Sequence, residues 1–126
     1  MVYLQHLTSA KTLGVGTPDY MAPELIRTDP MSKHGGRAYD AAMADVWSMG
    51  VTLYLMVVGW YPFEDPNHPR DMSVTLRNVC MGNYRSLPER LHGTDCADLI
   101  SRMLNPNPVN RLSIEDVRRH QWVSTD

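Results

Sequence analysis

The sequence predicts an all-α fold, and three observations lead to this expectation. Residues 39–59 are apolar nearly all round, which is typical of a long buried helix. Residues 71–81 and 95–104 repeat apolar side chains at helical spacing, so each segment predicts a shorter helix with one apolar face. No run alternates apolar and polar residues convincingly enough for a strand. At 126 residues, the chain is about the size of one domain with one core.

Charge and cysteine content narrow the functional classes. Twelve Lys plus Arg stand against fourteen Asp plus Glu, so no basic surface points to nucleic acid or to an anionic membrane. Cys80 and Cys96 form no CxxC pair and lie in helical patterns, which favours packing over a disulfide or a metal site and fits a reducing compartment. Residues 1–15 do not read as a secretory signal. We therefore expect a cytoplasmic or nuclear protein.

The first expected elements are two loops that flank a short helix. Residues 1–15 contain recurring Ser, Thr and Gly and little periodicity, as expected of a loop. Pro23 opens a short helix that continues to Ile26, because the missing N–H of proline is no loss in the first turn. Residues 28–37 contain Pro30 and two adjacent glycines without an apolar pattern, which predicts a surface loop.

Residues 39–59 form the predicted central helix, which other elements should enclose. We expect Pro62 to end it, because proline cannot continue a helix. The apolar stretch 46–61 could be mistaken for a membrane span. It has only sixteen residues and includes Ser, Gly and Thr, whereas a span takes about 20 predominantly apolar residues. A buried helix is the stronger interpretation, and we expect no membrane contact.

Three further helices are expected. The helix at 71–81 stops at Gly82, and the helix at 95–104 stops at a turn with two prolines. Ser113, followed three residues later by Asp116, resembles a capping box that opens the last helix. The expected apolar faces are Met72, Leu76, Val79 and Cys80, then Cys96, Leu99, Ile100, Met103 and Leu104, then Ile114, Val117 and Trp122.

Four motifs follow one another at defined spacing. Residues 16–24 end in Ala-Pro-Glu, and residues 44–51 read Ala-Asp-Val-Trp-Ser-Met-Gly-Val. Residues 61–63 read Tyr-Pro-Phe, and residues 99–122 contain Leu-Ile-Ser-Arg-Met-Leu, Asn-Arg and His-Gln-Trp. Any one of these would be a weak signal, but four in order make chance improbable. Together they resemble the C-terminal lobe of a eukaryotic-type serine/threonine protein kinase over about residues 12–123.

This resemblance implies a domain organisation. Residues 1–126 would be a partial protein kinase domain that lacks the N-lobe and the catalytic loop. Within it, residues 1–23 would be the remainder of the activation segment with the substrate loop, and residues 24–123 the helices of the C-terminal lobe. The wording of residues 61–71 resembles the plant and algal sucrose-non-fermenting-related kinases of the osmotic-stress branch. Calcium- and energy-regulated kinases share much of this wording and stay open as an alternative.

The resemblance also assigns roles to individual residues. Thr17 matches the threonine whose hydroxyl bonds the catalytic aspartate and lysine, although an ordinary loop threonine is the bland alternative. Glu24 matches a glutamate that pairs with a distant arginine, here Arg111, and such a pair contributes much if buried and little if exposed. Asp45 matches an aspartate that accepts backbone N–H bonds from the catalytic loop, and Trp47 is a core residue. The residues expected to seat the substrate are Gly16, Thr17, Pro18, Tyr20 and Ala22.

Three hydroxyls near the N-terminus are candidate phosphorylation sites, namely Thr8, Ser9 and Thr12. The usual regulatory position of the family, counted back from Glu24, falls on Leu13, so unmodified loop hydroxyls are about as good an interpretation. A second departure from the family is the length of residues 27–37, for which an added surface loop is the simplest account.

The groups that phosphoryl transfer needs are not found in this sequence. Its lysines, Lys11 and Lys33, lie outside any apolar strand pattern, and residues 14–16 form a bare Gly-x-Gly without the signature of a phosphate loop. Residues 68–71 imitate His-Arg-Asp but carry an inserted proline. The histidines, His6, His34, His68, His92 and His120, show no metal spacing. We expect no catalytic, cofactor-binding or metal-binding residue in this chain, and ATP and Mg²⁺ would belong to the complete kinase.

The resemblance therefore implies a fragment of a serine/threonine protein kinase, which is an ATP-dependent transferase. The fragment would supply the substrate-seating loop and a helical scaffold, and would be inactive alone. Its partners would be protein substrates, regulators and the missing kinase segments, but not nucleic acid. The alternative is a non-catalytic binding module for kinase substrates, regulators or phosphatases that uses residues 16–24 and 71–81. A third interpretation is that Met1 reflects a truncated gene model.

Overall fold

The structure is a computed structural model that describes residues 18–27 and 40–124. Its elements are η1 (Pro18–Tyr20), α3 (Pro23–Arg27), α4 (Ala41–Val58), α5 (Met72–Met81), η2 (Glu89–Leu91), α6 (Asp95–Met103) and α7 (Ile114–Arg119). Within the described ranges every regular element is helical, so the predicted all-α class is confirmed. The two short 3₁₀ helices, η1 and η2, were not predicted.

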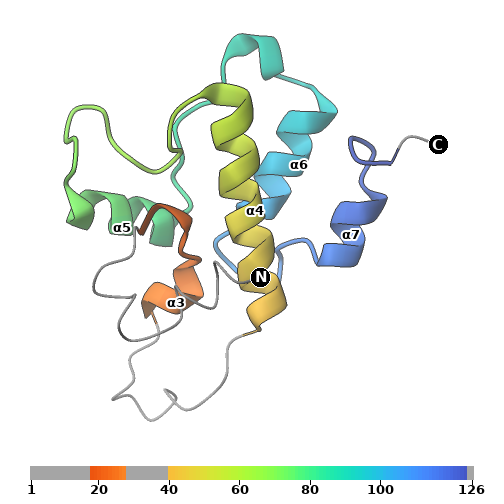
Figure 1. Ribbon diagram of the computed structural model, residues 1–126, viewed down its shortest axis with the longest axis horizontal. Coiled ribbons are helices and arrows are strands. Elements are labelled where there is room, and N and C mark those ends of the chain that lie inside the picture. Colours follow the sequence, from red (N-terminus) through yellow and green to blue (C-terminus); the bar gives the residue numbers. More distant parts are fainter. Residues whose placement is uncertain (1–17, 28–39, 125–126) are drawn as a thin grey trace.

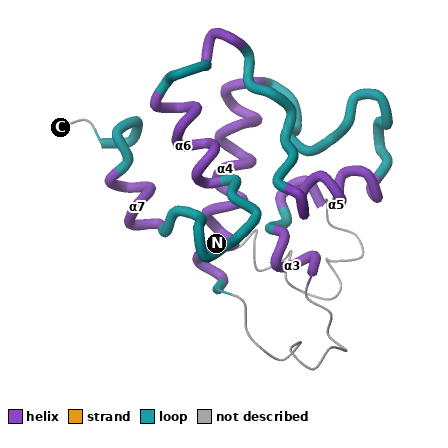
Figure 2. The backbone as a smooth tube through the Cα atoms, turned by 180° about the vertical axis from the view of Figure 1, so that it is seen from behind, coloured by secondary structure: helices purple, strands orange, loops and turns teal. Residues whose placement is uncertain are grey.

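Helix α4 is the central element around which the others are arranged (Figure 1). It packs against α6, α7 and η1, while α3 and α5 lie together beside it in both views (Figure 2). Asp40 caps its N-terminus by accepting hydrogen bonds from the backbone N–H groups of Ala42 at 3.0 Å and Met43 at 3.4 Å. This arrangement places residues from the whole length of the chain next to a single helix.

Helix α4 ends at Val58, before Pro62 is reached, so the expectation that Pro62 ends it is wrong. The C-cap is Gly59, whose φ of 103° lies in the left-handed region that glycine adopts without steric cost. The backbone N–H of Gly59 donates to the carbonyl of Leu55 at 2.9 Å and closes the last turn. The chain then reverses, which brings residues 61–64 back toward α4 and η1.

The core consists mainly of one face of α4 and the side chains packed on it. Trp47, Val51 and Tyr54 are fully buried in the larger cluster with Phe63 of the following loop. By length and composition alone α4 could cross a membrane, but its buried face marks it as the core helix of a packed domain. The opposite face is not enclosed, since Met56 is 76% exposed.

The inward faces of two helices differ from the predicted ones. In α5 the buried residues are Thr75 and Val79, while Met72 is 57% exposed. The predicted Val79 is buried and Leu76 and Cys80 are half-buried, so the pattern located part of this face. It missed Thr75, because a threonine does not count as apolar. In α7 only Val117 is buried, because the helix ends at Arg119 and Trp122 lies beyond it. The capping box of Ser113 and Asp116 and the buried face of α6 are as predicted.

Gly50 sets how closely α4 and α6 approach. A Cβ atom at this position would lie 2.9 Å from both the Leu104 Cδ2 atom and the Met103 Cβ atom. Contacts below 3.0 Å force a shift, and the Met103 Cβ atom is tied to the α6 backbone. The close crossing of the two helices therefore depends on the missing side chain.

We expect Gly50→Ala to lower the free energy of unfolding. Overpacking a well-filled core costs roughly 1–3 kcal/mol, which exceeds the gain of about 1 kcal/mol in helix propensity. Urea denaturation of the chain with the wild-type residue and with alanine measures the difference. Met56→Ala, on the exposed face of the same helix, serves as the control and should change stability much less. An unchanged or raised stability in Gly50→Ala would contradict the close-approach argument.

Candidate functional site

The candidate site is the segment 18–24, which we name the substrate loop and which comprises η1 and the start of α3. Tyr20 is half-buried, and Ala22 is fully buried as a member of the main core cluster. The side chain of Ala22 therefore packs into the core behind the loop. Its role in seating the substrate stays a prediction from the sequence. Five of the predicted residues lie outside the described part of the chain, namely Thr8, Ser9, Thr12, Gly16 and Thr17.

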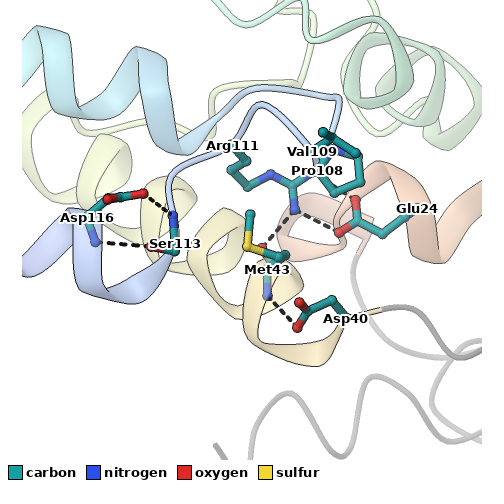
Figure 3. A pocket seen from close by; sticks show the side chains of 8 residues that line it. All are labelled: Glu24, Asp40, Met43, Pro108, Val109, Arg111, Ser113 and Asp116. Atoms are coloured by element: carbon teal, nitrogen blue, oxygen red, sulfur yellow. Dashed lines mark hydrogen bonds and ion pairs between the residues drawn. The ribbon is translucent and has the colours of Figure 1, made fainter.

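A buried ion pair joins this loop to the far end of the chain. Arg111 Nη1 donates to Glu24 Oε2 at 2.7 Å, and Arg111 Nη2 donates to Glu24 Oε1 at 2.8 Å (Figure 3). The Arg111 side chain is fully buried and that of Glu24 is 14% exposed. The pair expected from the resemblance is therefore present, with the two parallel bonds that make arginine–carboxylate contacts strong.

Arg111 donates two further hydrogen bonds, to two other segments. Its Nη1 also donates to the Met43 carbonyl at 2.7 Å, and its Nε donates to the Asn105 carbonyl at 2.9 Å. The guanidinium carbon lies 5.1 Å from the centroid of the Trp47 ring, within the range of a cation–π contact. One side chain thus fixes α3, the first turn of α4 and the turn after α6 relative to one another.

A cavity of about 530 Å³ opens beside this ion pair (Figure 3). Its lining comes from α3, the start of α4, the second half of the loop between α6 and α7, and α7 itself: Glu24, Asp40, Met43, Pro108, Val109, Arg111, Ser113 and Asp116. Asp40 and Asp116 both serve as helix caps, and backbone hydrogen bonding lowers the pKa of Asp116. The lining residues come from distant parts of the sequence, so no local pattern could have revealed this cavity.

Asp45 and Trp47 present buried polar atoms with unfilled hydrogen-bonding capacity. Within the described residues, Asp45 Oδ1 and Trp47 Nε1 have no hydrogen-bond partner. Burial raises the pKa of the Asp45 carboxyl, because the charged form loses its hydration. The Trp47 ring itself is well packed and stacks on Phe63 at 5.2 Å between centroids. A buried acceptor without a donor is costly, which makes Asp45 a position where a further donor would stabilise the fold.

Two side chains that the sequence did not single out hold the substrate loop from behind. Ser48 Oγ donates to the backbone carbonyl of Tyr20 at 2.8 Å. The Glu64 carboxyl lies beside that of Asp19, which is 9% exposed. That contact, together with burial and the nearby Asp19 charge, raises the pKa of Glu64 to about 7. Neither residue belongs to a local pattern, because each acts on a segment that lies far away in the sequence.

Comparisons with known proteins give a consistent picture. Residues 3–123 match the model of the protein kinase domain. Serine/threonine-protein kinase SAPK6 of Oryza sativa subsp. japonica is 45% identical over 109 residues, which are 86% of this chain and 27% of the rice protein. Serine/threonine-protein kinase SRK2C of Arabidopsis thaliana is 43% identical over the same length, or 29% of that protein. Serine/threonine-protein kinase SRK2A of Physcomitrium patens is 44% identical and is also covered to 29%.

The similarity extends to a solved structure. The twitchin kinase region from C. elegans is 25% identical, with a TM-score of 0.66 over 86% of this chain and 17% of that chain. The chain thus spans less than a third of the length of the curated relatives described above. Those relatives are plant serine/threonine kinases, as the wording of residues 61–71 had predicted.

We expect Glu24→Ala to destabilise the chain strongly. Removal of one partner leaves the Arg111 guanidinium buried without its counter-charge, which typically costs about 3–5 kcal/mol. The free energy of unfolding from urea denaturation measures this loss. Glu115→Ala is the matched control, because the Glu115–Arg118 pair is solvent-exposed and such pairs contribute about 1 kcal/mol or less. Equal effects of the two substitutions would show that burial of the Glu24 pair does not matter.

We expect Glu64→Gln to change how stability depends on pH. The pKa of Glu64 is raised from 4.5 to about 7, so its stabilising contribution is complete below about pH 4.5 and is lost as the pH rises through about 7. Glutamine cannot ionise, so the variant should gain stability relative to wild type between pH 5 and pH 8. Urea denaturation at pH 5 and at pH 8 measures the difference in the free energy of unfolding between Glu64→Gln and wild type.

The neighbouring carboxyl provides the control for this pH dependence. Hydrogen bonds from the Asn67 backbone N–H and from His68 lower the pKa of Asp65, so Asp65→Asn should show no such gain on raising the pH. A gap between Glu64→Gln and wild type that is the same at pH 5 and pH 8 would contradict the assigned pKa shift.

Proposed function

Because the chain belongs to the protein kinase domain family, we propose that it works within an ATP-dependent serine/threonine protein kinase, where it supplies the substrate loop and the helical scaffold. The protein substrate would carry the Ser or Thr hydroxyl that accepts the phosphoryl group. The plant relatives favour the osmotic-stress branch within this family, and stress signalling is the process we propose for it.

The buried Glu24–Arg111 pair is the observation that carries this proposal. It holds the start of α3 against α4 and against the turn after α6, so the substrate loop has a fixed place on the scaffold. Phosphoryl transfer depends chiefly on positioning and electrostatic stabilisation. A rigidly anchored loop is what a substrate hydroxyl requires if it is to meet a reactive phosphate in a defined geometry.

A buried acceptor atom of Asp45 is a second observation that supports this proposal. Its buried Oδ1 atom lies on α4 and finds no hydrogen-bond donor within the described residues. We infer that it accepts backbone N–H bonds from the catalytic loop of the working kinase, as the family resemblance implies. Such a contact would lower the cost of burying the carboxylate and would fix the catalytic loop to the same helix that supports the substrate loop.

We infer that other segments of the complete kinase hold the nucleotide and its metal ion. Among the described residues, no three His, Cys, Asp or Glu side chains are grouped so that they could hold a metal ion. The sequence likewise contains no Gly-Lys-Ser/Thr phosphate loop, no Asp-Phe-Gly and no intact His-Arg-Asp triplet. We therefore assign this chain no role in binding ATP or Mg²⁺, and we infer that the isolated 126 residues transfer no phosphoryl group.

A second candidate function is a non-catalytic binding module, and the surface of α5 favours it. Met72 and Met81 at the two ends of this helix are 57% and 67% exposed. Helix α5 also packs against α3 and η1, so the exposed methionines and the substrate loop belong to one continuous body. Flexible methionine side chains suit contacts with more than one partner.

The kinase proposal predicts that this chain can complete a kinase. A chimera in which the matched segment of rice SAPK6 is replaced by this chain should phosphorylate a protein substrate of SAPK6 with radiolabelled ATP. Substitution Glu24→Ala in the chimera should reduce phosphorylation at least about tenfold, if even 1.4 kcal/mol of the lost anchoring reaches the transition state. The isolated 126-residue chain should give no incorporation.

Three controls make the chimera decisive. Unaltered SAPK6 gives the reference rate, and Glu115→Ala, in the exposed ion pair, should leave the chimera as active as its parent. A folded chimera that binds the protein substrate but does not phosphorylate it would favour the binding module. Incorporation of phosphate by the isolated chain would contradict the assignment of the catalytic groups to other segments.

A further inference from the structure

The substrate loop has a second set of attachments, independent of the Glu24–Arg111 pair. Two consecutive residues of η1, Asp19 and Tyr20, are contacted by side chains from different elements. Ser48 belongs to the middle of α4, and Glu64 belongs to the loop that follows α4. We name Ser48 and Glu64 the loop clamp. Their contacts fall at the N-terminal end of the substrate loop, whereas the ion pair holds its C-terminal end.

Ser48 binds the loop backbone directly. Its side chain is 3% exposed, and its hydroxyl donates to the Tyr20 carbonyl at 2.8 Å. The alternative acceptor within its own helix, the Ala44 carbonyl, lies farther away at 3.3 Å. Because a serine hydroxyl has a single hydrogen, the shorter contact across to η1 is favoured. The bond therefore ties the loop backbone to α4 itself.

Glu64 holds the adjacent residue through its carboxyl group. A hydrogen bond between two carboxyl groups needs a proton, so the contact with Asp19 forms when Glu64 is protonated. Tyr20 and Tyr61 add an edge-to-face ring contact between η1 and the loop after α4. Their ring centroids lie 5.7 Å apart and their planes are at 90°. The loop after α4 thus meets η1 at two neighbouring points.

We propose that Ser48 and Glu64 are positioning residues that hold the N-terminal end of the substrate loop in its substrate-binding geometry. This inference rests on the proposed kinase function. As positioning residues, Ser48 and Glu64 act through the loop and would not touch the reacting atoms themselves. Their effect would be on how well a protein substrate is seated, and the affinity for ATP should not depend on them.

The groups around Glu64 make its part of the clamp sensitive to pH. Asp19 faces it from η1, and Arg85 acts on it from the segment after α5 and favours the charged form. Asp65 and Tyr84 line the same small pocket beside it, and burial raises the pKa of Tyr84 further above neutrality, so that ring stays uncharged. Ionisation of Glu64 at higher pH would place two carboxylates together and loosen the clamp.

The test compares clamp variants in the SAPK6 chimera and in the isolated chain. Ser48→Ala and Glu64→Ala should each raise the KM for a protein substrate roughly 2- to 12-fold, the range that corresponds to one net hydrogen bond. The KM for ATP should stay unchanged, which a general loss of folding would not produce. Glu64→Gln keeps a donor to Asp19, so it should restore a low KM and abolish the rise in wild-type KM between pH 6 and pH 8.

Two matched variants control for the substitutions themselves. Thr52→Ala removes a hydroxyl one turn along α4 that donates to the Ser48 carbonyl and, among the described residues, has no bond to the substrate loop. Asp65→Asn neutralises the carboxyl next to Glu64, which contacts Asn67 and His68 instead. Both should leave the KM for the protein substrate at its wild-type value.

Amide hydrogen exchange of the 126-residue chain gives a readout that does not depend on activity. Ser48→Ala and Glu64→Ala should speed exchange within residues 18–24, and the two controls should not. If the wild-type chimera is inactive, the kinase proposal fails, and the exchange experiment still decides whether the clamp exists. Unchanged KM in an active chimera, or unchanged exchange in the loop, would overturn the clamp.

Discussion

The fold depends most on one buried guanidinium. The Arg111 side chain places a full positive charge in a site without solvent contact, and such a charge is tolerated only where it is paired and hydrogen-bonded. Its acceptors are the Glu24 carboxylate and the carbonyls of Met43 and Asn105. Because these belong to three segments, none of the three can move without leaving part of the charge unpaired. The position of the substrate loop is therefore decided by a turn that lies more than eighty residues further along the chain.

Helix α4 is the frame on which these constraints combine. Along a little more than one turn it carries Asp45, whose Oδ1 atom has no hydrogen-bond partner among the described residues, Trp47 under the Arg111 guanidinium, and Ser48 bonded to the loop backbone. Gly50 follows and admits α6 to close contact. Each residue faces a different neighbour, so this short stretch determines the relative placement of the substrate loop, the ion pair and α6. A change in the backbone of this stretch of α4 would therefore displace the substrate loop, the ion pair and α6 together.

Much of this architecture could be predicted from the sequence, and the misses have physical causes. Long apolar periodicity located α4 and α6, and the Ser113–Asp116 box located the start of α7, because these signals are local. On the inward face of α5, Val79 was predicted and Thr75 was missed, because Thr75 is buried with a polar side chain.

The residues of the candidate site likewise include some that could be predicted from the sequence and some that could not. The partnership of Glu24 with Arg111 followed only from family resemblance, since no local rule links residues so far apart. Ser48 and Glu64 escaped notice for the same reason: their partners lie in η1, and only the folded chain brings them together. Two of the residues expected to seat the substrate, Gly16 and Thr17, lie outside the described ranges, so for them the sequence remains the only guide.

The left-handed cap at Gly59 limits where the chain can accept insertions and deletions. Between this residue and Glu64 there is a short tether whose two ends are both fixed, one by the last turn of α4 and the other by the contact with Asp19. Adding or removing one residue there would turn Phe63 out of its stack on Trp47 and carry Glu64 past its partner. The exposed stretch 66–70, by contrast, can change in length, and variation among proteins built on this plan should accumulate there.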